Sequence, residues 1–229
     1  MDQMKRYAVY YAPRPGAFAT RCAEWLGWDV ATGLPLVPPD LPGLPLPPGA
    51  LTAEPRRYGF HGTLRAPFRL AAGVTPAQAR DAVAALAQAT APVRCDGLAL
   101  RDLHGFLALI PLGCEAALLA LGAAVVEATD SLRAPLTPDE IARRRPEGLT
   151  PRQRQLLADW GYPFVMEEFR FHLTLTDRLA QGLAGPVASV LQAHLAPVLP
   201  RPFVIQDLCL MGEDATGRFR LLSRHTLTG

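Results

Sequence analysis

The stretch RYGFHGTLRAPF at residues 57–68 contains the pattern His-x-Thr, and the pattern returns in FRFHLTLT at residues 169–176. A single His-x-Thr is common by chance, whereas two copies in strand-like segments from different halves of one chain point to a shared role. Two imidazoles that titrate near neutral pH can divide the work of acid and base. The candidate pair, each with a hydroxyl donor two residues on, is His61 with Thr63 and His172 with Thr174.

Side chains on a strand alternate between two faces, so residues two apart share a side. In the second motif this predicts a polar face that carries Arg170, His172, Thr174 and Thr176. In the first motif the corresponding face carries Arg57, Gly59, His61, Thr63 and Arg65. Any half-buried strand turns polar residues outward. Two strands that both select His and then Thr, with Arg close by and no Asp or Glu, favour a functional face.

Helix and strand patterns alternate along the whole chain. Strands are expected at 5–12, 58–64, 93–101, 105–111, 168–176, 203–211 and 218–224. Helices are expected at 17–28, 75–88, 115–131, from 137, at 150–161 and at 186–195, and three of them open on Thr-Pro. Residues 35–48 contain seven prolines, which predicts an extended arm that packs on the body. A disordered linker is the alternative for this arm.

The order β-α-β-β occurs around the first motif, at 58–111, and again around the second, at 169–224. This repetition predicts an α+β fold with two pseudo-symmetric lobes. Each lobe is expected to have an antiparallel or mixed sheet with helices on its outer side, and the lobes face each other across a central groove. Residues 1–229 then form a single bilobal domain, with motif 1 at 61–63 and motif 2 at 172–174.

Charge and cysteine content limit the classes of protein. Basic residues number 23 and acidic residues 21, which argues against a protein that coats long nucleic acid by bulk electrostatics. All the basic residues except Lys5 are arginine, so each arginine needs a positional argument before it counts as a ligand. Cys22, Cys95, Cys114 and Cys209 show no zinc spacing and predict reduced, buried thiols. Without a signal-peptide core or a long apolar span, a cytoplasmic location and no membrane partner are expected.

The chemistry that fits this set is cleavage of a phosphodiester. One His removes a proton from the attacking water or hydroxyl, and the other donates a proton to the departing oxygen. The hydroxyls of Thr63 and Thr174 meet the charge on the phosphoryl oxygens, with Arg65 or Arg170 in support. Carboxylate ligands are missing from both faces, so a reaction without metal or other cofactor is predicted.

Three stretches carry a resemblance to a known family: RYAVYYAP at 6–13, RRYGFHGTLRAPF at 56–68 and LTPRQRQLLADWGYPFVMEEFRFHLTLT at 149–176. The chain resembles the 2H phosphoesterase superfamily, which includes 2′-5′ RNA ligase-like proteins and cyclic nucleotide phosphodiesterases. More closely, it resembles a bacterial subfamily of phosphonate-metabolism proteins. The resemblance implies a two-lobed α+β fold with a central groove, catalysis by His61 and His172, phosphate binding by Thr63 and Thr174, and hydrolysis of a cyclic phosphate without a cofactor.

Several alternatives stay open at this point. The substrate is either an RNA end or 2′,3′-cyclic nucleotide, or a ribose cyclic phosphate. A non-catalytic protein that binds RNA or nucleotide phosphoesters in the same groove is the main rival, and a metal-dependent hydrolase is another. The remaining histidines, His104, His194 and His225, have no Thr two residues later and are interpreted as structural or surface residues. The run Arg143–Arg145 favours a helix end, where cations suit the dipole, over the border of an anion groove.

Overall fold

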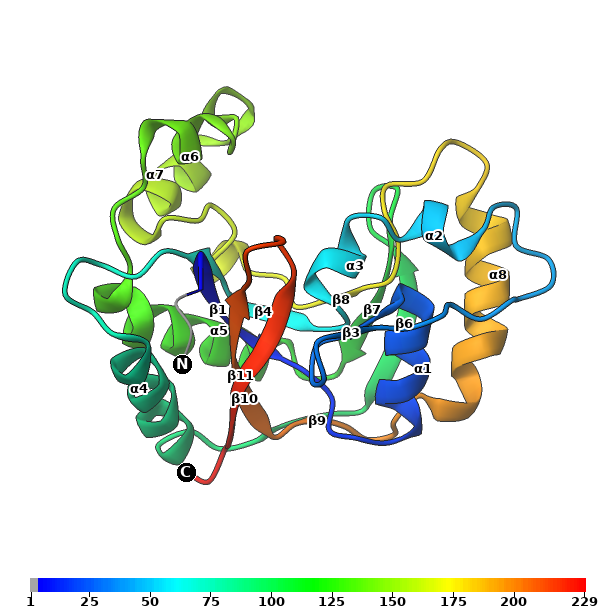
Figure 1. Ribbon diagram of the computed structural model, residues 1–229, viewed down its shortest axis with the longest axis horizontal. Helices are drawn as coiled ribbons and strands as arrows, with labels where there is room; N and C mark the ends of the chain where they lie inside the picture. Colours follow the sequence, from blue (N-terminus) through cyan, green and yellow to red (C-terminus); the bar gives the residue numbers. More distant parts are fainter. Residues whose placement is uncertain (1–3) are drawn as a thin grey trace.

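A seven-stranded sheet forms the centre of the computed structural model, which describes residues 4–229 (Figure 1). Its strands lie in the order β11-β10-β1-β4-β8-β7-β6, and each paired neighbour is antiparallel. They are β1 (Arg6–Tyr11), β4 (Gly62–Phe68), β6 (Gly97–Asp102), β7 (Leu107–Leu112), β8 (Leu173–Thr174), β10 (Asp207–Glu213) and β11 (Phe219–Thr226). Two small two-stranded sheets lie outside it, β2 (Trp28–Asp29) with β3 (Leu34–Pro35), and β5 (Val93–Cys95) with β9 (Phe203–Ile205).

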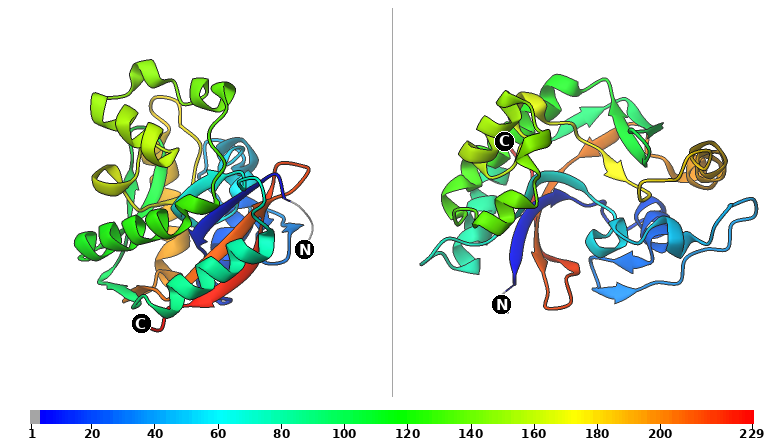
Figure 2. Two further views of the ribbon diagram at one scale, coloured as in Figure 1. Left: turned by 90° about the vertical axis from the view of Figure 1, so that its left-hand side faces the viewer. Right: turned by 90° about the horizontal axis from the view of Figure 1, so that it is seen from above.

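The helices cover the sheet in two groups, and the hydrophobic core lies between them and the strands. α4 (Pro76–Gln88) and α5 (Glu115–Thr129) lie side by side on the half that contains β1, β4, β10 and β11 (Figure 2). α1 (Ala17–Leu26) and α8 (Ala184–Leu195) contact each other at the other half (Figure 1). The remaining helices are α2 (Pro48–Leu51), α3 (Pro55–Tyr58), α6 (Pro138–Ala142) and α7 (Pro151–Trp160).

Helix starts follow the sequence closely. Thr75, Thr137 and Thr150 each form a capping box with the Gln or Glu three residues later, and each is followed by Pro at the first helical position. The cap satisfies backbone N–H groups that the first turn leaves without a partner, and Pro needs no such partner. The three predicted Thr-Pro starts are therefore confirmed.

The two β-α-β-β units exchange their hairpins. The hairpin β6–β7 follows β4 in the chain, yet it extends the sheet from β8. The hairpin β10–β11 follows β8, yet it pairs with β1 on the far side of β4. Likewise α4, which follows β4, packs against β10 and β11. The predicted α+β class is confirmed, and because the hairpins are exchanged, both halves of the chain contribute strands to each side of the sheet.

The strands at the two motifs differ from the sequence prediction, one in its position and the other in its length. The strand expected at 58–64 begins only at Gly62, because residues 55–58 form α3. The strand expected at 168–176 is reduced to Leu173 and Thr174. The proline-rich arm has no long regular element between 36 and 47, and its Leu41 and Leu44 pack against the core, as predicted for an arm that lies on the body.

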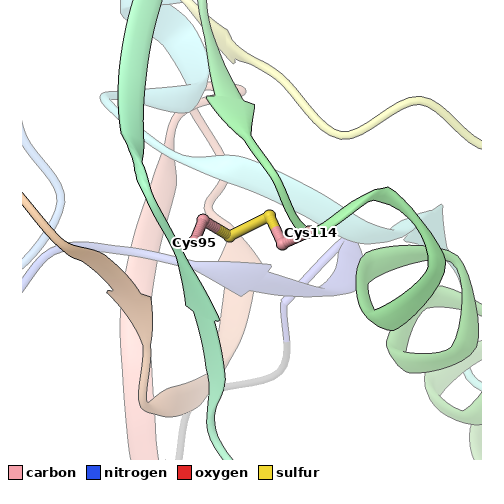
Figure 3. The surroundings of a disulfide bond; sticks show 2 residues. All are labelled: Cys95 and Cys114. Atoms are coloured by element: carbon pink, nitrogen blue, oxygen red, sulfur yellow. A yellow bond between two sulfur atoms is a disulfide. The ribbon is translucent and has the colours of Figure 1, made fainter.

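Cys95 and Cys114 form a disulfide, which corrects the prediction that all four thiols are reduced (Figure 3). Cys95 ends β5, and Cys114 comes directly before α5 with its Cα 5.0 Å away. The sequence spacing gave no sign of this pair, because the antiparallel hairpin β6–β7 between them is what returns the chain to the same place. Cys22 and Cys209 are free and buried, as expected.

Across residues 4–229, none of the helices combines the length and the apolar composition needed to cross a bilayer.

Candidate active site

His61 stands where the chain turns sharply from a one-turn helix into a strand. α3 ends at Tyr58, and Gly59 follows with φ of 68°, in the left-handed region that favours glycine. A side chain at Gly59 would also collide with Val30, since an ideal Cβ would lie 2.2 Å from its Cγ1. Glycine is therefore required at this turn, and the turn sets the direction of His61.

The two histidines are held by the same contact, a hydrogen bond to the carbonyl oxygen two residues earlier. The Nδ1–O distance is 2.8 Å from His61 to Gly59 and 2.8 Å from His172 to Arg170. A carbonyl oxygen only accepts, so each Nδ1 carries the hydrogen and each Nε2 of the neutral ring has a free lone pair. Nε2 of His61 lies 3.1 Å from Oγ1 of Thr63, whose hydroxyl donates to it.

A cavity of about 580 Å³ lies beside both motifs. His61 and Thr63 of the first motif line it, together with Thr174 of the second. His172 does not line the cavity. The centroid of its ring lies 5.8 Å from the ring centroid of Phe106, and Phe106 is a lining residue. The structure thus gathers three of the four motif side chains at one cavity and sets the fourth next to its wall.

A short strand holds the second motif in place. β8 meets β4 at one paired position, Gly62 with Leu173, and this position joins the two lobes at the motifs. On its other side Leu173 pairs with Leu109 of β7. The buried indole of Trp25, from α1, donates a 2.8 Å hydrogen bond to the carbonyl oxygen of Leu175. Because β8 has so few ladder bonds of its own, its neighbours determine where it lies.

Aromatic rings surround both imidazoles. The ring of Tyr10 stacks on His61 with centroids 3.9 Å apart and an interplanar angle of 24°. The pKa of His61 is lowered to about 4: burial is the main cause, the charge of His172 adds to it, and the hydrogen bond to Gly59 opposes it. The pKa of His172 is also lowered by burial, against the hydrogen bond to Arg170. Both rings are therefore neutral at pH 7 in the free protein, and they are close enough to sense each other's charge.

Arg65 does not lie on the face that the sequence predicts for the first motif. The pairing of β1 with β4 slips between Val9–Arg65 and Tyr10–Thr63, so β4 has an extra residue at this point. Such a bulge breaks the two-residue alternation, and Thr63 and Arg65 no longer share a side. Arg65 is only 2% exposed and binds Asp130 at 2.8 Å, and it does not line the cavity.

Arg170 also lies outside the cavity lining. Its guanidinium donates to the backbone carbonyls of Glu167 and Phe169, both at 2.7 Å. The backbone carbonyl oxygen of Arg170 is what contacts the site, because it accepts the hydrogen bond from Nδ1 of His172. The sequence argument assigned the charge of Arg170 to the substrate, whereas its backbone is what positions the motif histidine.

The arginines that line the cavity are Arg144 and Arg178. Arg178 follows the second motif and donates to the carbonyl oxygen of His104 at 2.5 Å. Arg144 follows α6, and its guanidinium lies 4.8 Å from the ring centroid of Tyr162. The run Arg143–Arg145 therefore ends a helix, as favoured from the sequence, and also borders the cavity, which was the less favoured alternative.

Sequence reasoning missed four aromatic residues of the cavity wall. The rings of Tyr10, Tyr58, Phe106 and Tyr162 line the cavity and come from four separate segments. No local pattern marks them, because a strand or loop aromatic is more often core than wall. The quoted stretches YAVYY and RRYGFHG contain the first two, and their closeness to the first motif is the one available signal.

Two carboxylates also line the cavity, and both come from positions outside the two predicted motif faces. Asp177 follows the second motif, and Glu54 precedes α3. Asp177 accepts hydrogen bonds from the backbone N–H groups of Ala53 and Glu54, at 2.8 and 2.9 Å. It thereby ties the segment before the first motif to the end of the second. Of the other histidines, His104, His194 and His225, none lines the cavity.

The family model "Protein of unknown function (DUF1045)" matches residues 63–220, and the chain belongs to this family. Two curated relatives are both called ribose 1,5-bisphosphate phosphokinase PhnN. One, from Janthinobacterium sp. (strain Marseille), is 37% identical over 222 residues, and the match covers 94% of this chain and 49% of the relative. The other, from Laribacter hongkongensis (strain HLHK9), is 36% identical over 218 residues, with 94% and 50% covered. The chain spans about half the length of the curated relatives it matches.

Similar solved structures include a phosphoesterase, with 16% identity, a TM-score of 0.46, and 99% of this chain and 100% of that chain covered. E. coli LigT in apo form has 16% identity, a TM-score of 0.47 and 100% of both chains covered. E. coli LigT complexed with 3′-AMP has 14% identity, a TM-score of 0.45, and 99% and 100% covered.

Proposed function

We propose that this protein is a 2H-type phosphodiesterase that hydrolyses a cyclic phosphate by general acid–base catalysis from two histidines, without a metal ion. The observation that carries the proposal is the shared arrangement of His61 and His172. Each has Nδ1 bound to a carbonyl oxygen at 2.8 Å and Nε2 available for proton transfer. The charge of His172 lowers the pKa of His61, which lines the cavity, while His172 lies next to Phe106 of its wall. A protein that only binds phosphate has no need of two such groups.

We assign the base to His61 and the acid to His172. A ring with a pKa of about 4 is neutral over most of the pH range, so the Nε2 lone pair of His61 is ready to take a proton from water. The water oxygen then forms a bond to phosphorus, and one phosphorus–oxygen ester bond breaks. In the active form His172 carries a second proton, on Nε2, and the departing oxygen takes this proton. His61 then releases to solvent the proton gained from water, and His172 takes one from solvent, which restores both rings. General acid–base catalysis of this kind contributes about 10²–10⁴-fold.

The remaining cavity residues bind the phosphoryl group. The hydroxyls of Thr63 and Thr174 donate to its non-bridging oxygens, and the hydroxyl of Thr63 turns from Nε2 of His61 to do so. The guanidinium groups of Arg144 and Arg178 supply charge-assisted donors. Arg65 and Arg170, expected from the sequence to do this, are left out of the proposed ligand set because neither lines the cavity.

Among the substrates considered, a ribose cyclic phosphate is the better candidate. The relatives are named for an activity on ribose 1,5-bisphosphate, and they are about twice as long as this chain. Water that opens a 1,2-cyclic phosphate of ribose at the 2-oxygen leaves the phosphate on C1, which is one of the two positions in that name. The alternatives, an RNA end and a 2′,3′-cyclic nucleotide, use the same chemistry at a different pair of hydroxyls.

A turnover screen tests the proposal. Purified protein is incubated with ribose 1,2-cyclic phosphates, 2′,3′-cyclic nucleotides and an RNA with a cyclic end, in buffer with strong chelator. We expect hydrolysis of at least one, reduced at least 100-fold in His61→Ala and in His172→Ala. His104→Ala, which removes an exposed imidazole outside the cavity, is the matched control and keeps full activity. Affinity without turnover on every compound favours the non-catalytic binder, and activity that chelation abolishes favours a metal-dependent hydrolase.

A further inference from the structure

A second pocket of about 270 Å³ adjoins the candidate active site, and we call it the basic pocket. It shares Tyr58, Pro67 and Arg144 with the catalytic cavity, so the two spaces are continuous at these residues. Its walls come from α3, the end of β4, and the segment around α6. Six of its lining residues are Arg6, Arg57, Arg69, Arg133, Arg143 and Arg144. The only carboxylate among the described lining residues is Glu140.

Three of these arginines are already paired with carboxylates of the protein. Arg6 pairs with Glu213 at 2.6 Å. Arg69 binds both oxygens of Glu140, at 3.0 and 2.9 Å. Arg133 pairs with Asp130 at 3.1 Å. These groups build the walls of the basic pocket and keep little charge for a ligand.

The other three keep their charge available. Within residues 4–229, Arg143 and Arg144 have no carboxylate within ion-pair distance and donate no side-chain hydrogen bond to the protein. Arg57 has one contact of 3.4 Å with Glu54, and both side chains are largely exposed, so that pair is weak. Three cations without a strong ion pair around one small pocket repel one another, and an anion between them removes this cost.

We propose that the basic pocket binds a second phosphate of the substrate, a phosphomonoester on the same small molecule whose cyclic phosphate lies between the histidines. The inference rests on the proposed function and names the substrate class: a sugar that carries both groups. Planar guanidinium groups match phosphate oxygens two at a time, which suits Arg57 and Arg143. Arg144 lines both spaces, so it stands between the two phosphates of one bound molecule.

Product-type ligands test this without turnover. Titration calorimetry at fixed ionic strength compares ribose 1,5-bisphosphate with ribose 1-phosphate, which differ only in the second phosphate. We expect wild-type protein to bind the bisphosphate at least about tenfold more tightly, the range for charge-assisted hydrogen bonds. Arg57→Ala and Arg143→Ala each reduce this ratio severalfold, and the double variant brings it close to one. Arg80→Ala removes an equal charge on α4, outside both pockets, and leaves the ratio unchanged.

Several results overturn the inference. Equal affinity for the two ligands does so, as does no measurable binding of either, or variants that weaken both ligands equally. If an RNA with a cyclic end binds more tightly than the bisphosphate, the basic pocket serves a polynucleotide and not a small sugar. Because neither ligand is hydrolysed, a preference for the bisphosphate in a protein without turnover leaves this inference standing while the proposed activity fails. Turnover of cyclic phosphates without a preference for the bisphosphate supports the proposed activity and overturns this inference.

Discussion

Replacement of Gly62 by Ala is expected to damage both the fold and the site, because this glycine is where the two lobes touch. An ideal Cβ at Gly62 would lie 2.2, 2.6 and 2.9 Å from Cζ, Cε2 and Cε1 of Phe171. Comfortable carbon contacts are about 3.5–4.0 Å, so the ring edge would have to retreat by roughly 1.5 Å. Phe171 is 6% exposed and contacts Tyr11 and Phe203, which leaves it little room.

Overpacking of this kind costs about 1–3 kcal/mol of unfolding free energy. In a chain of this size each kcal/mol lowers Tm by about 2–4 °C, so Gly62→Ala should melt about 4–8 °C earlier for a central cost of about 2 kcal/mol. Phe171 directly precedes His172, and a catalytic group displaced by about 1 Å loses rate on the order of 100-fold. We therefore expect a fall in kcat/KM larger than the loss of stability alone would cause.

Thermal melting and initial rates measure the two effects. Phe171→Leu in the Gly62→Ala background makes room for the new methyl group, so the double variant should be more stable than the sum of the single changes predicts. Gly148→Ala is the control, since its Cβ meets no atom within 4 Å, and it should stay within about 0.5 kcal/mol of wild type. A Gly62→Ala protein with unchanged Tm and unchanged kcat/KM would refute the reasoning.

Three further changes separate structural roles from catalytic ones. Asp130→Asn removes the negative charge that the buried guanidinium of Arg65 shares with Arg133, and should cost about 2 kcal/mol in denaturant unfolding, discounted because Asp130 is partly exposed. A loss of kcat/KM without loss of stability would indicate instead that Arg65 acts in the site. Cys95→Ser opens a loop of 19 residues and should cost about 3 kcal/mol, seen as a lower Tm under non-reducing conditions; equal melting would mean that the bond is not formed. Asp177→Asn removes a carboxylate that accepts two backbone N–H groups and should raise KM more than it lowers kcat; a pure kcat effect would instead indicate proton transfer.

The features that sequence predicted are those set by local chemistry. The Thr-Pro helix starts at Thr75, Thr137 and Thr150 depend on contacts within one turn, so the sequence contains all the information needed. The pairing of His61 with Thr63 is similar, because both belong to one short segment. The α+β class followed from the alternation of periods along the chain.

The features that sequence missed depend on contacts between distant segments. The bulge in β4 exists only in the pairing with β1, and it turns Arg65 away from the side of Thr63. Arg144 reaches the cavity because the segment after α5 returns to it, which no periodicity indicates. The exchange of hairpins between the two lobes and the bond between Cys95 and Cys114 have the same origin, since both result from tertiary pairing.

The pH dependence of kcat/KM in single histidine variants tests the acid–base assignment most directly. With His61 deprotonated above a pKa of about 4 and His172 protonated only below a pKa that is itself under 6.5, wild-type kcat/KM should be bell-shaped, with its maximum on the acid side of neutrality. The residual activity of His61→Ala should lose the rise on the acid side, and that of His172→Ala should lose the fall on the alkaline side. If both limbs survive in both variants, the two imidazoles do not carry the protons and the account is wrong.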